Sequence, residues 1–411
     1  MSVYKTSRSL NIKFGIVQGL MYACMGSFGG FIVALGLAKG YSQSSVSLAL
    51  SLNMICTIAG NLFFGSLADR FDKNKQIFVF CMALSAVAQA GMVMSSFFPV
   101  YVLFYAMLGF FMGPVGALLD TWVLRGINFD IKTYGRIRSM GALGYGVMML
   151  VAGILVNRYG YFTAMVVSDT LCITDLLFAA FLVKNITRAE LFLADPSRKP
   201  ETVSTASKHS NPIKELTKSG AYIGWVIMIF LIGLSMAPIN SMKIVIMESV
   251  GGDVSSLGID GFLGCSVQFV LLCASGLIAG ISTKKREVII AAMTGVSVVL
   301  CMFANSTIMV YGASIILYGL FSFVNPTTRE IVKDNISYEH QTVAIGIADL
   351  SYGNISTVVA MLYAGTVSER FGLHTMIMMC FITVLVPIAL ALLSVLKDQI
   401  DNKHKHCCQT V

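Results

Sequence analysis

Long apolar runs alternate with short polar stretches along the whole chain, and each run is about as long as a helix that crosses a membrane. Twelve runs are present, at about 13–37, 44–67, 76–96, 99–124, 136–156, 162–184, 219–247, 256–281, 287–305, 308–328, 341–365 and 372–396. A helix that spans the hydrocarbon core needs about 20 apolar residues, whereas a strand of a membrane barrel needs only about 9–11. Because lipid offers no partner to a free backbone amide, the pattern predicts twelve membrane-spanning α-helices.

The composition agrees with a membrane protein. Of the 411 residues, 56% are hydrophobic and 12% are charged, while soluble domains are about 25% charged. Three basic residues precede the first apolar run, as in a signal peptide, but that run is long enough to stay in the membrane. We therefore expect an all-α, multi-pass membrane protein.

The basic residues lie almost entirely in alternate connections between the apolar runs. If the N-terminus is cytoplasmic, 25 of the 29 Lys and Arg residues lie in cytoplasmic segments, and the exceptions are Lys39, Arg158, Lys243 and Arg370. Cytoplasmic loops of membrane proteins are enriched in these residues. We therefore predict a protein of the cell membrane with both termini in the cytoplasm. The net charge of +8 then reflects short loops between spans and does not indicate nucleic-acid binding.

The apolar runs divide into two sets of six. The hydrophilic stretch 185–218 is rich in Ser, Thr, Pro and Lys and predicts a flexible cytoplasmic linker. This gives an N-terminal bundle (1–184), a C-terminal bundle (219–396) and a cytoplasmic tail (397–411). The two sets also repeat each other: "GILVNRYG" from Gly153 is matched by "GTVSERFG" from Gly365, and the Gly65 region by the Gly276 region. The repeat predicts two six-helix bundles related by pseudo-two-fold symmetry.

The connection between the second and third runs carries a recognisable motif, "GSLADRFDKNKQ" from Gly65 to Gln76. It is similar to the loop signature of the major facilitator superfamily, although Asp72 stands where that family usually has glycine. The resemblance implies a transporter fold and a gating role for Gly65, Asp69, Arg70 and Lys73. From the residues alone, an inside loop needs such basic side chains in any case.

A second motif joins the fourth and fifth runs: "LLDTWVLR", followed by "YGRIRSMGALGYG". It resembles the branch of the superfamily that contains lactose-permease-like, nucleoside:proton and phenylpropionate permease-like carriers. That resemblance implies that Asp120, paired with Arg136 or Arg138 on the neighbouring helix, handles substrate or protons. The alternative is a structural ion pair at the membrane edge.

Other ionisable residues fall inside or near the spans, where a charge is costly and faces a partner or a wet cavity. Lys243 and Asp260 are expected to pair across a short loop, unless Lys243 extends to the outer surface. Asp349 is a candidate proton site, or it takes part in a helix-packing hydrogen bond. Asp169 and Asp175 raise the same question in the sixth run, and Asp175 has no partner evident from the sequence.

Uncharged polar residues in the spans are candidates for lining a central cavity, and they are equally compatible with helix–helix contacts. They are Tyr22, Gln18, Asn53, Asn240, Tyr352 and Asn354. Glycines of the first and fourth runs are expected at close helix contacts, and Pro114 is expected to kink the fourth helix.

The sequence contains no metal-ligand cluster, phosphate-binding loop or catalytic constellation. We therefore expect no enzyme and no cofactor, but a secondary active transporter that works by alternating access, as a monomer, in the lipid bilayer. The first hypothesis for its activity is proton symport of a small polar solute such as a sugar, nucleoside or aromatic acid. The alternatives are a facilitator or antiporter of organic anions or drugs, and a membrane sensor or scaffold without transport.

Overall fold

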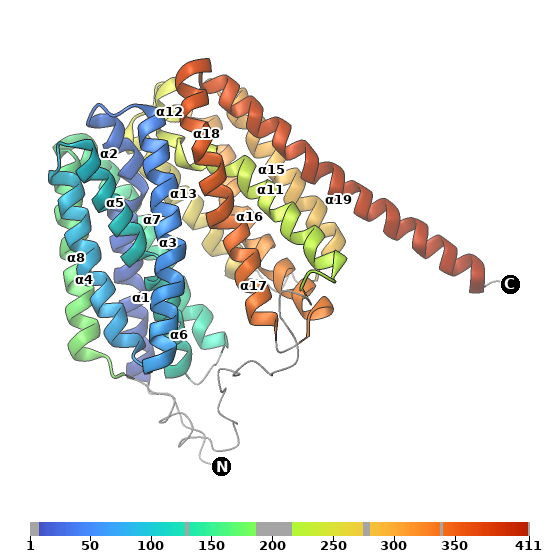
Figure 1. Cartoon of the computed structure of the whole chain (residues 1–411), viewed down its shortest axis with the longest axis horizontal. Helices are drawn as coiled ribbons and strands as arrows, with labels where there is room; N and C mark the ends of the chain where they lie inside the picture. The colour runs from blue at the N-terminus through green and yellow to red at the C-terminus, as the bar shows by residue number, and fades with distance from the viewer. Residues whose placement is uncertain (1–7, 128–130, 186–215, 274–279, 338–339, 410–411) are drawn as a thin grey trace, which may run out of the picture. The chain divides into compact units, whose positions relative to one another are not determined.

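A computed structural model describes residues 8–127, 131–185, 216–273, 280–337 and 340–409, and every secondary-structure element in these ranges is helical. In chain order the elements are α1 (Arg8–Phe28), η1 (Gly29–Phe31), α2 (Ile32–Ala38), α3 (Gln43–Phe71), α4 (Asn74–Met94), α5 (Phe98–Met112), α6 (Val115–Gly126), α7 (Ile131–Tyr159), α8 (Tyr161–Leu182), α11 (Gly220–Ser241), α12 (Lys243–Ser249), α13 (Val254–Cys273), α15 (Thr283–Met302), α16 (Thr307–Asn335), α17 (Gln341–Leu350), η3 (Ser351–Ile355), α18 (Ser356–Phe371) and α19 (Leu373–Gln409) (Figure 1).

The described part of each of the twelve predicted runs is mainly helical, so the predicted all-α membrane fold is confirmed. Within the described ranges, eleven helices are long and apolar enough to cross a membrane. The ninth predicted run corresponds to α15, which fails that test because Lys284, Lys285, Arg286 and Glu287 occupy its first turns. Its apolar remainder still forms a regular helix beside α16 and α19.

Several helices are interrupted, and the sequence explains one interruption directly. The fourth run breaks into α5 and α6 at Gly113 and Pro114, as the proline predicts. The first run passes through the short 3₁₀ segment η1. The eleventh run contains the π-helical segment η3, a form that is rare and often lies at functional sites.

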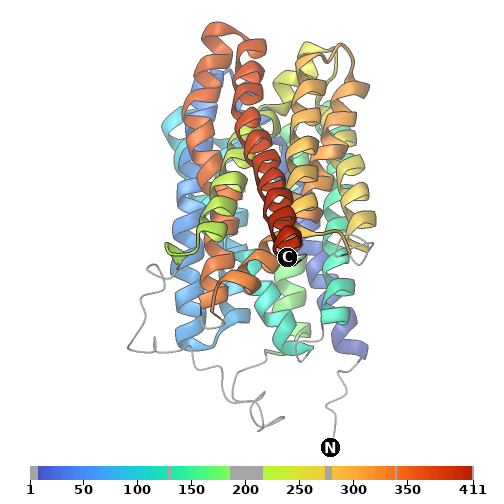
Figure 2. The same cartoon turned by 90° about the vertical axis from the view of Figure 1, so that its right-hand side faces the viewer.

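Some predicted segments lie wholly or partly outside the described residues. Only the ends of the predicted linker 185–218 are described, and Gly276, which carries the internal repeat, is not. The predicted tail continues as part of α19, which Figure 2 shows in red as one continuous helix up to the C-terminal marker.

Contacts between residues group the chain into two units. Unit 1 comprises residues 1–210 and 252–269, and unit 2 comprises residues 211–251 and 270–411. Most of α13 therefore groups with the N-terminal helices, because it packs against α7. A Cβ on Gly153 would lie 2.9 Å from the Cα of Gly258, and the Asn157 amide donates to Asp253 Oδ2 at 2.8 Å. The predicted division at the linker stays a prediction.

The core of unit 1 holds α1, α6 and α7 in fixed register. Phe14 of α1 packs edge-on against Trp122 of α6, with 5.3 Å between ring centroids, inside a cluster of fully buried side chains. On the other side of α1, a Cβ on Gly26 would lie 2.4 Å from the Tyr145 carbonyl oxygen of α7. Only glycine permits this backbone approach, so α1 and α7 are locked together along their length.

The core of unit 2 is built where α11 meets α16 and α17. The Trp225 indole donates to Thr328 Oγ1 at 3.0 Å, and the Tyr222 hydroxyl donates to the Ala344 carbonyl oxygen at 2.9 Å. Further along α11, a Cβ on Gly233 would lie 2.2 Å from the Tyr352 carbonyl oxygen. The π-helical segment η3 thus packs directly on the α11 backbone.

Candidate functional site

An acid and a base meet inside unit 1, on two helices that follow each other in the chain. Asp120 lies on α6 and Arg138 on α7, and Arg138 Nε lies 3.9 Å from Asp120 Oδ1. The side chains are 29% and 35% exposed, respectively. The distance is at the limit of an ion pair, and a pair this accessible is stabilised only weakly, by about 0–1 kcal/mol. Both groups are therefore available to a ligand.

The first helix contributes two further side chains to this pair. The Gln18 amide donates to Asp120 Oδ1 at 3.4 Å. The Tyr22 ring lies under the Arg138 guanidinium, with 4.3 Å from Cζ to the ring centroid, which is a cation–π arrangement. Because Gln18 and Tyr22 are four residues apart, both project from the same face of α1.

Tyr134 completes the group, and the sequence analysis did not identify it. Its hydroxyl interacts with both Asp120 and Arg138. Tyr134 lies four residues before Arg138, about one turn of the helix, so the two share a face of α7. That spacing was the available signal; only the rotation of α7 toward α6 shows that this face carries the site. We define Gln18, Tyr22, Asp120, Tyr134 and Arg138 as the polar cluster (α1, α6 and α7 in Figure 1).

Glycine at position 141 makes room for the polar cluster. A Cβ there would lie 2.7 Å from Tyr22 Cδ2 and 3.2 Å from Arg138 Nη1. Position 141 lies three residues after Arg138, on the same stripe of α7. The stripe therefore alternates a tyrosine, an arginine and a glycine that lets the Tyr22 ring fit against the helix.

Two residues predicted for this site are placed elsewhere in unit 1. Arg136 is exposed and forms no ion pair within the described chain; of the two candidate partners of Asp120, the structure pairs Arg138. Asn53 is buried and donates to the Tyr105 carbonyl oxygen at 2.7 Å. Asn53 thereby joins α3 to α5, at the point where a Cβ on Gly109 would lie 2.3 Å from the Asn53 carbonyl oxygen.

The predicted pair of Lys243 and Asp260 falls in different units, and its pairing stays a prediction. Lys243 opens α12 and is 5% exposed, with Nζ 5.3 Å from the centroid of the Tyr318 ring. Its burial contradicts the alternative that the side chain extends to the outer surface. Asp260 lies in unit 1 and is also buried.

The remaining cavity candidates lie in unit 2. Asp349 is exposed at the end of α17, and Arg329 of α16 acts on it electrostatically. Tyr352 and Asn354 are half-buried in η3, and Asn240 is exposed near the end of α11. The structure thus supplies a base for Asp349 that is distant in the sequence. The roles of these residues stay predictions.

The loop motif proposed for gating is described in part. Arg70 and Lys73 are exposed, and the Asp69 side chain lies outside the described residues. A Cβ on Gly65 would meet nothing within 4 Å in the described chain, so this glycine makes no close helix contact there.

Asp72, which departs from the motif, has two functions in the turn. It adopts the left-handed conformation, with φ of 54°, in which the family's glycine is favoured. Its carboxylate also accepts a hydrogen bond from Arg125 Nη1 at 2.7 Å. The aspartate tolerates the glycine conformation and ties the loop to α6.

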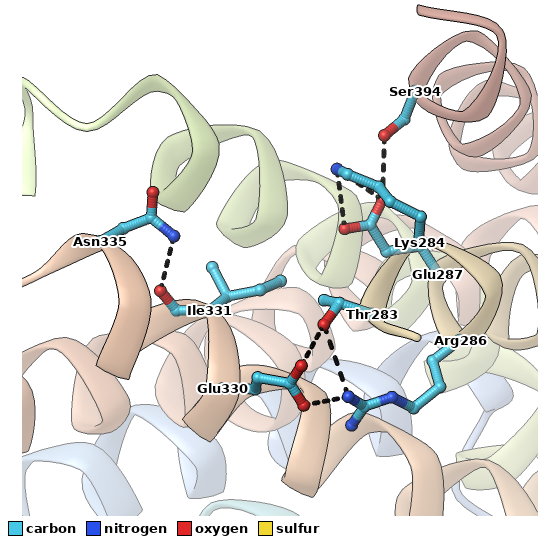
Figure 3. A network of polar contacts seen from close by, with 8 residues as sticks. All are labelled: Thr283, Lys284, Arg286, Glu287, Glu330, Ile331, Asn335 and Ser394. Carbon is cyan, nitrogen blue, oxygen red and sulfur yellow. Dashed lines mark hydrogen bonds and ion pairs between the residues drawn. The ribbon is translucent and has the colours of Figure 1, made fainter. Parts of the chain in front are cut away.

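A second ionic network, missed by the sequence analysis, lies in unit 2 where α15, α16 and α19 meet (Figure 3). Glu330 of α16 accepts a hydrogen bond from Thr283 Oγ1 at 2.5 Å and pairs with Arg286 of α15. Glu287 pairs with Lys284 at 3.2 Å and accepts a hydrogen bond from Ser394 of α19 at 3.2 Å. These contacts join the first turns of α15 to α16 and α19.

Known proteins with similar sequences are transporters. The model of the MFS_1 like family matches residues 12–349. A maltose permease of Geobacillus stearothermophilus is 20% identical over 365 residues, which is 89% of each chain. The uncharacterized transporter YwbF of Bacillus subtilis (strain 168) is 25% identical over 223 residues, which cover 54% of this chain and 52% of that protein. The chain thus matches about half the length of this second relative.

Solved structures of transporters share the fold. A mutant of the nucleoside transporter NupG superposes with a TM-score of 0.81 at 15% identity, covering 93% of this chain and 99% of that one. A bacterial homolog of the human lysosomal transporter Spinster superposes with a TM-score of 0.69 at 10% identity, covering 96% and 97%. At these identities the likeness concerns the fold alone.

Proposed function

Because the chain belongs to the MFS_1 like family and is a membrane transporter, we propose that it moves a small polar organic solute by alternating access, driven by proton symport. The polar cluster of α1, α6 and α7 is the proposed solute site in unit 1. We further propose that the protein acts in a cell membrane with both termini in the cytoplasm, which the distribution of basic residues supports.

The observation that carries this proposal is the loosely paired, accessible Asp120 and Arg138 beside the Tyr22 ring. A carboxylate, a guanidinium, an amide and a phenol together offer both donors and acceptors, as hydroxyl-rich solutes require. The aromatic ring offers a flat apolar surface for a sugar face or a base. The cluster therefore suits a sugar or a nucleoside.

The charge balance of the cluster favours a neutral solute over an organic anion. Asp120 neutralises Arg138, and Arg136, the other arginine of this motif, is exposed and lies apart from that pair. An anion would have to compete with Asp120 for Arg138 and would leave the carboxylate without its partner. A neutral solute can bridge the two groups without that cost.

Counterflow in proteoliposomes tests the proposal. Proteoliposomes that contain the purified protein are loaded with unlabelled uridine, maltose or lactate. Entry of the same compound in labelled form is then followed. We expect exchange of uridine or maltose and none of lactate. Exchange of lactate alone would instead support the organic-anion alternative, and exchange of none, together with no thermal stabilisation by any of them, would favour a sensor or scaffold.

A pair of matched variants locates the site. Arg138→Gln should abolish exchange, because it removes the guanidinium from both Asp120 and Tyr22. Asp120→Asn should abolish concentrative uptake under an inward proton gradient. Concentrative uptake retained by Asp120→Asn would show that the solute site lies elsewhere.

A further inference from the structure

A buried polar group separate from the polar cluster lies in unit 1, between α1, α4 and α8. Ser168 and Cys172 lie on one face of α8, and Ser168 Oγ is 3.0 Å from the Cys24 carbonyl oxygen of α1 and 2.9 Å from Gln89 Oε1 of α4. The Cys172 thiol donates to the Met82 carbonyl oxygen of α4 at 3.3 Å. These contacts join α8 to α1 and α4 in the interior of unit 1.

Asp175 lies on the same face of α8, three residues after Cys172, and it is the least satisfied member of the group. Its side chain is 0% exposed, and neither carboxylate oxygen has a hydrogen-bond partner within the described chain. The helix-packing hydrogen bond that the sequence left possible for Asp175 is therefore absent from the described residues. A buried acid without a partner requires an explanation.

Within the described residues, no cationic side chain pairs with Asp175. From α1, the thiol of Cys24 is the ionisable group that acts on it. The lysines nearest this end of α8 are bound elsewhere: Lys13 of α1 donates to the Leu182 carbonyl oxygen, and Lys75 of α4 donates to those of Ala180 and Val183. On its own helix the nearest charged group is another acid, Asp169, and α7, which also packs on α8, directs Arg138 to Asp120 instead.

An ionised carboxylate in this setting would carry a large desolvation cost that no hydrogen bond within the described residues offsets. A carboxyl group that holds a proton has no charge and avoids that cost. We propose that Asp175 is a proton-binding site of the transporter, occupied in the conformation described here and emptied when α1 moves relative to α8. This inference rests on the proposed proton coupling and adds a residue to it that lies outside the polar cluster.

The first helix connects Asp175 to the polar cluster. Tyr22 and Cys24 are two residues apart and so point to nearly opposite sides of α1, one toward Arg138 and the other toward the α8 group. Because Gly26 locks α1 onto α7, a solute that displaces Arg138 also shifts α1. That shift changes the packing around Asp175, and so couples solute binding to proton binding through one rigid element.

Infrared difference spectroscopy on the full-length protein in lipid vesicles tests the proton directly, without a solute. At pH 7, wild type should show the carbonyl stretch of a protonated carboxylic acid, which Asp175→Asn removes. Asp253→Asn is the matched control: Asp253 is exposed and hydrogen-bonded at the start of α13, so its loss should leave the band in place. Absence of the band from correctly folded wild type would overturn the proposal, whatever the protein transports.

Transport then tests the coupling. With whichever of uridine or maltose shows counterflow, Asp175→Asn should retain counterflow within about threefold and lose accumulation driven by a proton gradient. Proton entry per solute equal to that of wild type would make Asp175 a structural acid and overturn the proposal. If Asp175→Asn does not fold, the wild-type band is followed instead on adding the solute: a change in its intensity supports the proposal, and an unchanged band overturns it. Failure of counterflow in wild type would concern the proposed function alone, because the infrared band does not depend on it.

Discussion

Two acid–base pairs share the short helix α6, and they differ in almost every physical respect. Asp120 faces Arg138 at 3.9 Å with both side chains about one third exposed, whereas five residues later Arg125 is 6% exposed and donates to Asp72 at 2.7 Å. The first pair is loose and accessible at both side chains, whereas the second is short and has a buried arginine beside an aspartate that is 26% exposed. A transporter needs both kinds: a site that a ligand can open and a joint that must stay closed.

The difference follows from what surrounds each pair. Arg125 is buried, and its charge is held by Asp72, which ends α3 in the left-handed conformation. Arg138 instead also contacts two tyrosines, and Asp120 also accepts from the Gln18 amide, so several weak contacts replace one strong contact. Weak and redundant contacts can be exchanged for those of a solute at little cost.

The largest effect is expected from breaking the tight pair. Arg125→Met should lower the free energy of unfolding by about 3 kcal/mol, because Asp72 loses the short ion pair that the buried guanidinium gives it. Unfolding in mixed detergent micelles measures this. The matched change at the loose pair, Asp120→Asn, should alter stability by less than about 1 kcal/mol. Equal losses would show that the two pairs do not differ as proposed.

Crowding the loose pair should impair binding without unfolding the protein. Gly141→Ala places a methyl group against Tyr22 and Arg138, and we expect about tenfold weaker apparent affinity for the transported solute, equivalent to ~1.4 kcal/mol. Gly135→Ala is the control, because a Cβ there meets nothing within 4 Å of the described chain. Equal affinities of the two variants would place the solute away from this stripe of α7.

The contribution of the Tyr22 ring can be separated from that of its hydroxyl. Tyr22→Leu should weaken apparent affinity about fivefold, in keeping with a cation–π contact of about 1 kcal/mol. Tyr22→Phe should stay within about twofold of wild type, since the ring under Arg138 remains. A larger loss in Tyr22→Phe than in Tyr22→Leu would assign the contact to the hydroxyl. Initial rates of counterflow at several solute concentrations give both values.

The smallest effect is expected at the base that the structure leaves out of the pair. Arg136→Gln should change counterflow by less than about twofold, because Arg136 is exposed and forms no ion pair within the described residues. The measurement also checks the choice between the two arginines. A loss in Arg136→Gln as large as in Arg138→Gln would mean that Asp120 exchanges partners during the transport cycle.

The apolar pattern alone determined the helical fold. Runs of about 20 apolar residues have one stable form in lipid, because every backbone amide must find a partner within its own helix. The break at Pro114 followed for the same local reason, since proline lacks the amide hydrogen that a continuous helix uses. The short loop between the fourth and fifth runs also placed Asp120 and an arginine on adjacent helices.

Tertiary structure decided which side chains meet. Arg138 rather than Arg136 pairs with Asp120, and Tyr134 joins them, because of the rotation of α7, which the close contact of Gly26 with the Tyr145 backbone helps to set. Arg286 pairs with Glu330, 44 residues away, and the carboxylate of Asp175 is fully buried without a hydrogen-bond partner in the described part of the chain. Hydropathy is a property of each helix by itself, whereas each of these contacts depends on how two or three helices are rotated and how deep they lie in the membrane. The helices could therefore be predicted from the sequence and these contacts could not, because the bilayer selects helices by composition and packing alone orients their polar faces.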